Sequence, residues 1–126
     1  MIVKLTIYGN PATKKNSQSI IINRATGRPM LIQAKRYRDY EKDCIQQITG
    51  LYRKKIDYPV TVICKYFRKT RHRVDLTNLL EATDDILVKA GVLADDNSKI
   101  IKSHDGSRVF FDKDNPRVEI EIVEYS

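Results

Sequence analysis

The chain has 126 residues, a formal net charge of +7, and a composition that is 41% hydrophobic and 31% charged. This length supports one hydrophobic core but not two, so we expect a single domain over residues 1–126. No apolar run approaches the roughly 20 residues of a membrane span, and the N-terminus lacks the pattern of a signal peptide, so we expect a cytoplasmic protein without a membrane segment. The positive charge favours a polyanionic partner such as nucleic acid, with ordinary solubility charge as the alternative.

The first half of the chain predicts a strand, a hairpin and a helix. Apolar and polar residues alternate over 3–7, as in a half-buried strand. Short strands over 19–22 and 30–32 flank a connection that contains glycine and proline, which suits a hairpin. Helical spacing then runs from about 35 to 52, with an apolar stripe made of Tyr37, Tyr40, Cys44, Ile45, Ile48 and Tyr52.

The second half predicts a strand, a second helix and two or three further strands. Period-two alternation indicates a strand over 58–67, and a helix is predicted over 78–90. Short strands are expected over 99–103 and 108–111, and the alternation is clearest over 118–122. The order β-β-β-α-β-α-β-β(-β) predicts an α+β domain in which two main helices pack on a mixed β-sheet.

Several kinds of site are excluded by the residues present. The two cysteines, Cys44 and Cys64, lie far apart in predicted helix and strand, so we expect buried thiols rather than a disulfide or a metal pair. With His72 and His104 as the two histidines, neither a His-rich zinc site nor an HNH-type nuclease site is expected. There is no phosphate-binding loop and no dinucleotide fingerprint, so we expect no nucleotide cofactor. His104 itself is expected in a turn.

An acidic segment interrupts the basic chain at residues 74–97, where six carboxylates accompany a single cation, Lys89. A helical wheel places Glu81 and Asp85 with Asn78 on a polar stripe away from the core-facing arc, without a cation between them. Like charges four residues apart repel each other, so this stripe is a poor solubilising surface. Carboxylates are ligands that Mg²⁺ prefers, so the segment favours a magnesium site, with a solvated helix face as the alternative.

The other acids of this segment lie around the same helix. Asp84 falls on the margin of the core-facing arc, Asp75 precedes the helix, and the pair Asp95 and Asp96 follows its closing turn. Because the helix is roughly 20 Å long, the chain must fold back after it, or run beside the strand that leads to Asp75, before these groups can meet. Magnesium ions held by such acids activate water and stabilise the leaving oxygen in phosphodiester cleavage.

A basic segment directly precedes these acids. Cations within 65–73 neutralise phosphates and give salt-dependent binding to nucleic acid, with a solvated loop as the alternative. Tyr66 and Phe67 lie among them and either stack on an unpaired base or pack in the core, and we expect core packing for at least one. The residues expected to bind DNA are Lys14, Lys15, Arg68, Lys69, Arg71 and Arg73, with Arg24 and Arg28 in the hairpin as further candidates.

Two stretches resemble the signature of the RusA family of Holliday junction resolvases. "DLTNLLEATDDILVKAGVLADDN" is similar to the family's central motif, which runs Asp-x-Asp-Asn, a helix with a further acid, a glycine turn and Asp-Asp. "YGNPATKKNSQ" is similar to its N-terminal Gly-x-Pro-x-x-Lys-Lys segment. The resemblance covers most of the chain. It implies a homodimeric endonuclease, dependent on one or two Mg²⁺ ions per active site, that resolves four-way DNA junctions by paired cleavage during recombination and repair at the nucleoid.

Matched residue by residue, the resemblance implies roles for several acids. Asp75 corresponds to the first catalytic aspartate and Asn78 to the asparagine that follows it. Asp85 corresponds to the acid within the helix. Asp95 and Asp96 correspond to the closing pair, in which Asp96 takes the place of the aspartate counted as catalytic.

Two positions depart from the family pattern. Thr77 stands where the family has its second aspartate, and Glu81 stands where it has a helical lysine. We hypothesise that Glu81, one helical turn beyond Thr77, returns the missing carboxylate to the site. The expected metal ligands are then Asp75, Asp96, Asp95, Glu81 and Asp85, of which all but Asp85 are expected to be catalytic, while Asn78 and Thr77 support them.

Two other functions stay open on the sequence. One is a non-catalytic DNA-binding module in which the acids form a structural metal site, and the change at Thr77 favours it. The other is a metal nuclease that acts on other branched or single-stranded DNA.

Overall fold

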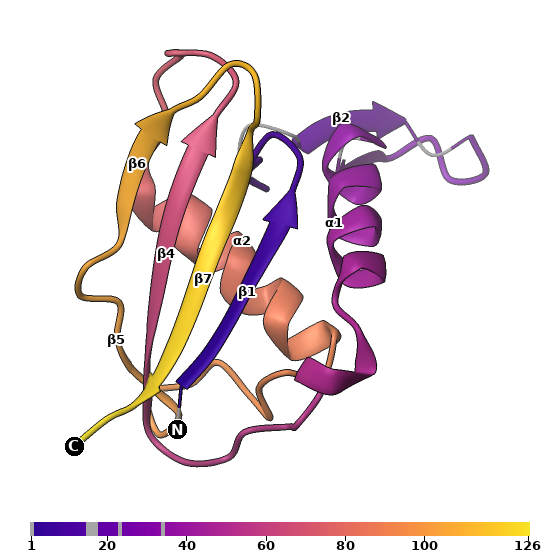
Figure 1. Ribbon diagram of the computed structural model, residues 1–126. Coiled ribbons are helices and arrows are strands. Elements are labelled where there is room, and N and C mark those ends of the chain that lie inside the picture. The colour runs from indigo at the N-terminus through magenta and orange to yellow at the C-terminus, as the bar shows by residue number, and fades with distance from the viewer. Residues whose placement is uncertain (1, 15–17, 23, 34) are drawn as a thin grey trace.

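The computed structural model describes residues 2–14, 18–22, 24–33 and 35–126 (Figure 1). Its strands and helices follow in the predicted order of an α+β domain. No helix within these residues is long and apolar enough to cross a membrane. The elements are β1 (Ile2–Tyr8), β2 (Gln18–Ile22), β3 (Pro29–Gln33), α1 (Lys35–Gln47), a short 3₁₀ helix (Gly50–Tyr52), β4 (Val60–Arg68), α2 (Leu76–Lys89), β5 (Ile101–Ser103), β6 (Arg108–Phe111) and β7 (Arg117–Glu124).

The main sheet is mixed, as predicted. Strand β7 lies between β1 and β4 and is antiparallel to both. Strands β5 and β6 lie one after the other along the far side of β4 and run parallel to it. Strand β5 meets the start of β4, where Val60 is opposite Ile101, and β6 meets its end, where Arg68 is opposite Phe111. The chain that leaves α2 therefore returns to the beginning of β4.

Helix α2 packs across one face of this sheet and forms the core with it (Figure 1). Because side chains alternate between the faces of a strand, every second residue of β1, β4 and β7 points toward the helix and is buried. The helix ends at Lys89, and Gly91 follows in the predicted capping position with a φ of 80°, which favours glycine. The predicted helix face is confirmed, because Leu79, Leu80, Thr83, Ile86, Leu87 and Ala90 are all buried.

Helix α1 lies beside β1 and is shorter than predicted. It ends at Gln47 rather than near residue 52, because Thr49 takes up an extended conformation and Gly50 begins a separate 3₁₀ turn. Both residue types have low helix propensity. The Gln47 side chain accepts a hydrogen bond from the Tyr8 backbone nitrogen at 2.8 Å and donates one to its carbonyl at 2.7 Å. The helix is thereby fixed to the edge of the sheet.

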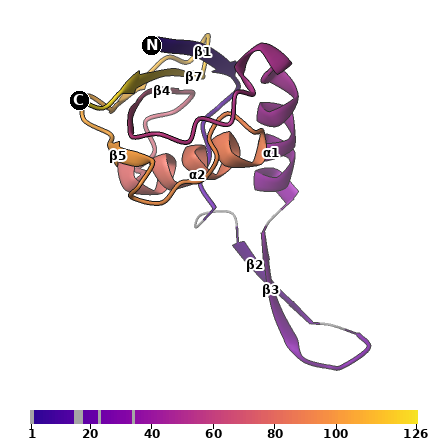
Figure 2. The ribbon, with the colours of Figure 1, turned by 90° about the horizontal axis from the view of Figure 1, so that it is seen from below.

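The predicted hairpin is formed by β2 and β3, which pair antiparallel with Ile20 opposite Leu31. It projects away from the rest of the chain on the side of the sheet that α2 covers (Figure 2). Arg24 and Arg28, in its connection, are exposed. A basic arm therefore extends beyond the helical layer.

Candidate active site and nucleic-acid interface

Asp75 stands immediately before α2, in the N-cap position with extended backbone angles. Its side chain makes no capping hydrogen bond, and its partner is the amide nitrogen of Asn78, 3.4 Å from Oδ2. Both Thr77 and Glu81 are exposed one turn apart on the same helix, as the compensation hypothesis requires. The Asp75 carboxylate thus faces solvent at a helix N-terminus, where the backbone favours negative charge and where its lone pairs are available to a cation.

Asp85 carries two lysine partners, which corrects the expectation of a stripe without neutralising cations. Its Oδ2 lies 2.9 Å from Nζ of Lys14 and 3.2 Å from Nζ of Lys89. Burial by itself raises the pKa of Asp85, but the two lysines outweigh this effect and hold the pKa below its ordinary value. A metal ion at Asp85 would have to displace both ammonium groups.

Asp84 is buried on the opposite margin of α2 and pairs with a histidine. Nε2 of His104, in the turn after β5, lies 3.0 Å from Oδ1 of Asp84. Burial raises the pKa of Asp84, the hydrogen bond from His104 opposes that rise, and the charge of nearby Asp96 adds to it. The pair joins residues that are 20 positions apart. Sequence reasoning placed His104 in the turn correctly but did not find its partner, because no local pattern connects them.

The closing pair of acids lies in the exposed loop between α2 and β5. Oδ1 of Asp95 accepts a hydrogen bond from the Asp96 backbone nitrogen at 2.7 Å, and Oδ2 accepts one from the Asn97 amide at 3.0 Å. Just before them, Leu93 pairs with Ile56, in the segment that leads into β4. The segment that leads to Asp95 and Asp96 therefore runs beside the segment that leads into β4, whereas Asp75 follows the end of β4.

The acids therefore occupy three separate environments around α2. Asp75 stands at its start, Asp85 faces the lysines, and Asp84 lies with His104 and near Asp96. Across the part of the chain that the structure describes, no three His, Cys, Asp or Glu side chains are close enough together to hold one metal ion.

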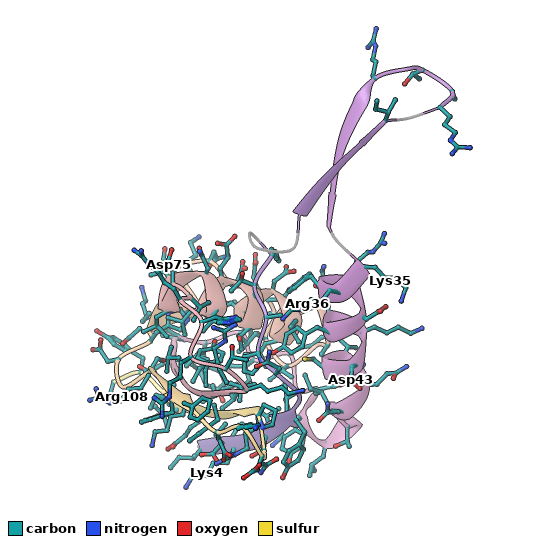
Figure 3. All side chains as sticks on the ribbon, turned by 90° about the horizontal axis from the view of Figure 1, so that it is seen from above. Lys4, Lys35, Arg36, Asp43, Asp75 and Arg108 are labelled. Carbon is teal, nitrogen blue, oxygen red and sulfur yellow. The ribbon has the colours of Figure 1, made fainter. Side chains whose placement is uncertain are left out.

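A basic cleft of about 630 Å³ is lined as far as Val74, the residue before Asp75. Its walls come from three places: the segment after β1, the first turn of α1, and the end of β4 with the loop that follows. Asp75 and Arg36 both lie on the side of the chain from which the hairpin projects (Figure 3). The lining residues are Asn10, Ala12, Thr13, Arg36, Arg68, Lys69, Thr70, His72, Arg73 and Val74.

The predicted DNA-binding residues divide between this cleft and other places. Arg68, Lys69 and Arg73 line the cleft. Arg71 is exposed, and its guanidinium lies 4.1 Å over the ring of Phe111. Lys14 is engaged with Asp85, and Lys15 lies outside the described residues. Arg36 was not among the predicted DNA-binding residues. It lies in the first turn of α1, and helical spacing alone does not show which other segment such a residue contacts.

The segment after β1 contacts both the loop after β4 and helix α2. Gly9 has a φ of 125°, a value that favours glycine, and it turns the chain away from β1. The Asn10 side-chain oxygen then accepts a hydrogen bond from the Lys69 backbone nitrogen at 2.9 Å, while Lys14 reaches Asp85. The stretch "GNPATK" thus ties the basic loop and the acidic helix together.

Neither aromatic residue of the basic segment is free to stack on a base. Tyr66 is fully buried, and its hydroxyl forms a 2.7 Å hydrogen bond with the Thr83 hydroxyl. Phe67 stacks on Phe110 with ring centroids 5.0 Å apart, and the Arg117 guanidinium lies 3.9 Å over the Phe67 ring. The expectation of core packing for at least one of them is confirmed by Tyr66.

Comparison with known proteins gives one family. No curated protein matches the chain. The model of the family described as endodeoxyribonuclease RusA matches residues 9–123, which span the segment after β1, both helices and nearly all of β7. The chain belongs to the RusA family of endodeoxyribonucleases.

Proposed function

We propose that the protein is a Mg²⁺-dependent endonuclease that cuts four-way DNA junctions as a homodimer. The observation that carries the proposal is a basic cleft whose lining reaches Val74, directly before the exposed Asp75, in a chain of an endodeoxyribonuclease family. Cations that hold the DNA backbone and a carboxylate open to a metal ion are the two parts that phosphodiester cleavage requires.

The residues present suit a magnesium ion. Mg²⁺ usually binds one or two carboxylates and completes its shell with waters and substrate phosphate, so a preformed cluster of acids is not required. Asp75 offers an exposed carboxylate without a cation partner among the described residues. When bound, the ion supplies activation of water and stabilisation of the leaving oxygen. We propose Asp75 as its first ligand and one of Asp96, Asp95 and Glu81 as its second, which requires the two carboxylates to move together when the ion binds, with Asp85 as a further candidate if its lysines move away.

The chain's own residues have a separate task, which is to hold the substrate. Arg68, Lys69 and Arg73 bring positive charge to the cleft and neutralise phosphates on one side of Asp75. Thr77 and Asn78 follow Asp75 in the first turn of α2 and offer a hydroxyl and an amide beside it. A two-fold dimer presents two such sites to the two-fold symmetry of a junction, which would produce paired nicks.

The proposal is tested with a labelled synthetic four-way junction, a linear duplex of the same sequence, and Asp75→Asn. We expect wild-type protein to cut the junction in the presence of Mg²⁺ and to leave the duplex intact. Loss of Asp75 should reduce the cleavage rate by at least about a hundredfold, because a lost metal ligand removes several kcal/mol of transition-state stabilisation. Asp57→Asn, at an exposed position before β4, is the matched control and should cut normally.

Two results would favour the other functions. Binding of the junction without any cleavage would support a DNA-binding module, which the change at Thr77 makes worth testing. Equal cleavage of junction and linear duplex would contradict junction resolution and indicate a metal nuclease with another DNA substrate.

A further inference from the structure

We propose that Arg36 and Arg68 together form a binding site for a single phosphate group of the DNA backbone, next to the phosphate that is cut. The inference rests on the proposed function for the identity of the ligand as DNA. Arg36 begins α1 and Arg68 ends β4, so the two side chains reach the cleft from different parts of the chain.

The Arg68 guanidinium is held in place but is not fully used. Its Nη1 donates a 2.9 Å hydrogen bond to the His72 carbonyl, which fixes the side chain against the loop. Its Nε is buried and has no hydrogen-bond partner within the described part of the chain. Most buried donors are paired, and an unpaired one is costly, so a small movement of this side chain that brings Nε to an acceptor on a ligand would stabilise the guanidinium.

Charge at this place is also unbalanced. Both guanidiniums line the same cleft, and the positive charge of Arg36 adds to burial in lowering the pKa of Arg68. None of the described residues that line the cleft is acidic. A planar guanidinium matches the oxygens of a phosphate group, and one anion between two of them would turn repulsion into attraction.

A hydrogen bond joins two walls of the cleft. The 2.9 Å hydrogen bond from the Lys69 backbone to the Asn10 side chain joins the loop after β4 to the segment after β1. Arg73 and Val74 continue the lining to the residue before Asp75. Because the lining of the cleft reaches Val74, the residue before the proposed metal ligand Asp75, we assign the bound phosphate to the DNA backbone near the cleaved position.

The experiment measures equilibrium binding of a four-way junction in EDTA, where no cleavage occurs, over about 50 to 200 mM salt. Each phosphate contact contributes about 0.9 to the slope of log affinity against log salt, so Arg36→Gln should bind more weakly and reduce that slope by about one. Lys35→Gln is the matched control. Lys35 is adjacent and equally charged, but it pairs with Asp39 at 2.8 Å and does not line the cleft.

One further variant guards against a folding defect. Arg36→Lys keeps the charge and should keep the salt slope, while it loses the paired hydrogen bonds and binds more weakly than wild type. If Arg36→Gln has the same slope as Lys35→Gln and wild type, Arg36 does not contact a phosphate and the inference is wrong. Binding is measured without cleavage, so the two proposals can fail separately. If Arg36→Gln reduces the salt slope but the wild-type protein never cuts the junction, the proposed function is wrong and the phosphate site stands.

Inorganic phosphate distinguishes the source of the ligand. It should raise the melting temperature of wild-type protein more than that of Arg36→Gln, since a ligand that binds the folded state stabilises it. Phosphate stabilisation through Arg36, combined with an unchanged DNA salt slope, would identify a site for free phosphate and would overturn its assignment to DNA.

Discussion

Nε2 of His104 lies 2.9 Å from Oδ2 of Asp84, and this contact joins the turn after β5 to the middle of α2. We predict that Asp84→Ala lowers the free energy of unfolding by about 1–3 kcal/mol, because it leaves the half-buried imidazole without its acceptor. Asp84→Asn should cost less, since an amide keeps a hydrogen bond and removes a buried charge. Urea unfolding measures both. Glu81→Ala, on the exposed face of the same helix, should change stability by no more than about 0.5 kcal/mol. Equal losses at Asp84 and Glu81 would show that the pair contributes nothing.

The two departures from the family pattern give a prediction about catalysis. If Glu81 supplies the carboxylate that Thr77 lacks, Glu81→Gln should reduce Mg²⁺-dependent junction cleavage by about tenfold or more, with junction binding in EDTA unchanged. The double variant Thr77→Asp with Glu81→Lys restores the family residues and should recover cleavage. Both positions are exposed on α2, so neither change should disturb the core. Full activity of Glu81→Gln would refute the compensation hypothesis.

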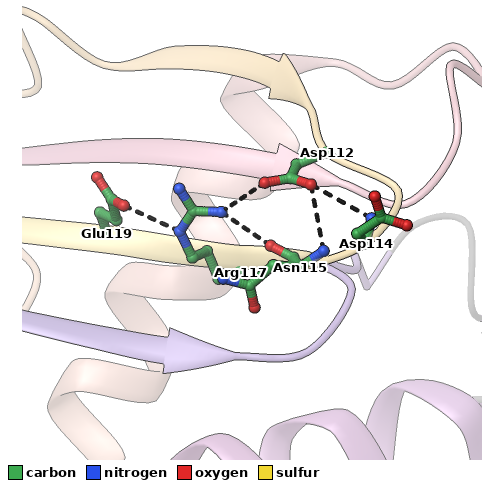
Figure 4. A network of polar contacts seen from close by, with 5 residues as sticks. All are labelled: Asp112, Asp114, Asn115, Arg117 and Glu119. Atoms are coloured by element: carbon green, nitrogen blue, oxygen red, sulfur yellow. Dashed lines mark hydrogen bonds and ion pairs between the residues drawn. The ribbon is translucent and has the colours of Figure 1, made fainter.

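Arg117 organises a polar network at the start of β7, on the face of the sheet that α2 does not cover (Figure 4). Its Nη1 donates 2.9 Å hydrogen bonds to Asp112 Oδ2 and to the Asn115 carbonyl, and its Nε donates one to Glu119. The hydrogen bond from Arg117, assisted by the backbone nitrogens of Asn115 and Asp114, holds the pKa of Asp112 below its ordinary value. Asp112 therefore stabilises the fold above its ordinary pKa and loses that effect as the pH falls through the lowered one.

The resulting prediction concerns stability in acid. The difference in free energy of unfolding between wild type and Asp112→Asn should be largest at neutral pH and should shrink as the pH falls from about 4, the ordinary pKa of the carboxyl, to the lowered pKa of the native state. Urea unfolding across this range tests it. Lys113→Gln changes the adjacent exposed charge but does not titrate in acid, so its own difference from wild type should show no such step. A pH-independent difference for Asp112→Asn would contradict the assigned role of the ion pair.

The two thiols should be inert in the folded protein. Cys44 and Cys64 are fully buried, and burial raises the pKa of each thiol to about 12. Because the thiolate is the reactive form, Ellman's reagent at about pH 8 should label neither cysteine before unfolding and both after denaturant is added. Rapid labelling of one thiol in the native protein would indicate that the core around α1 or β4 opens locally.

The sequence by itself determined the elements and their buried faces. The helical spacing from Leu79 to Ala90 and the alternation from Val118 to Ile122 predicted which side chains enter the core, and the structure confirms them. Both patterns are local, because a helix or strand repeats its direction every few residues. The family signature around Asp75 was equally local, so it could be read without any knowledge of how the chain folds.

Only the tertiary structure decided which charged groups meet. Asp84 pairs with His104, Asp85 pairs with Lys14, and Arg36 lines the same cleft as Arg68. The first contact depends on β5 running parallel to β4, the second on the course of the segment after β1, and the third on α1 lying against the edge of β1. Such contacts depend on strand direction and on where loops return, which residue spacing does not encode. The six acids that form one segment in the sequence are therefore divided in space, and the basic cleft beside Asp75 is assembled from three distant segments.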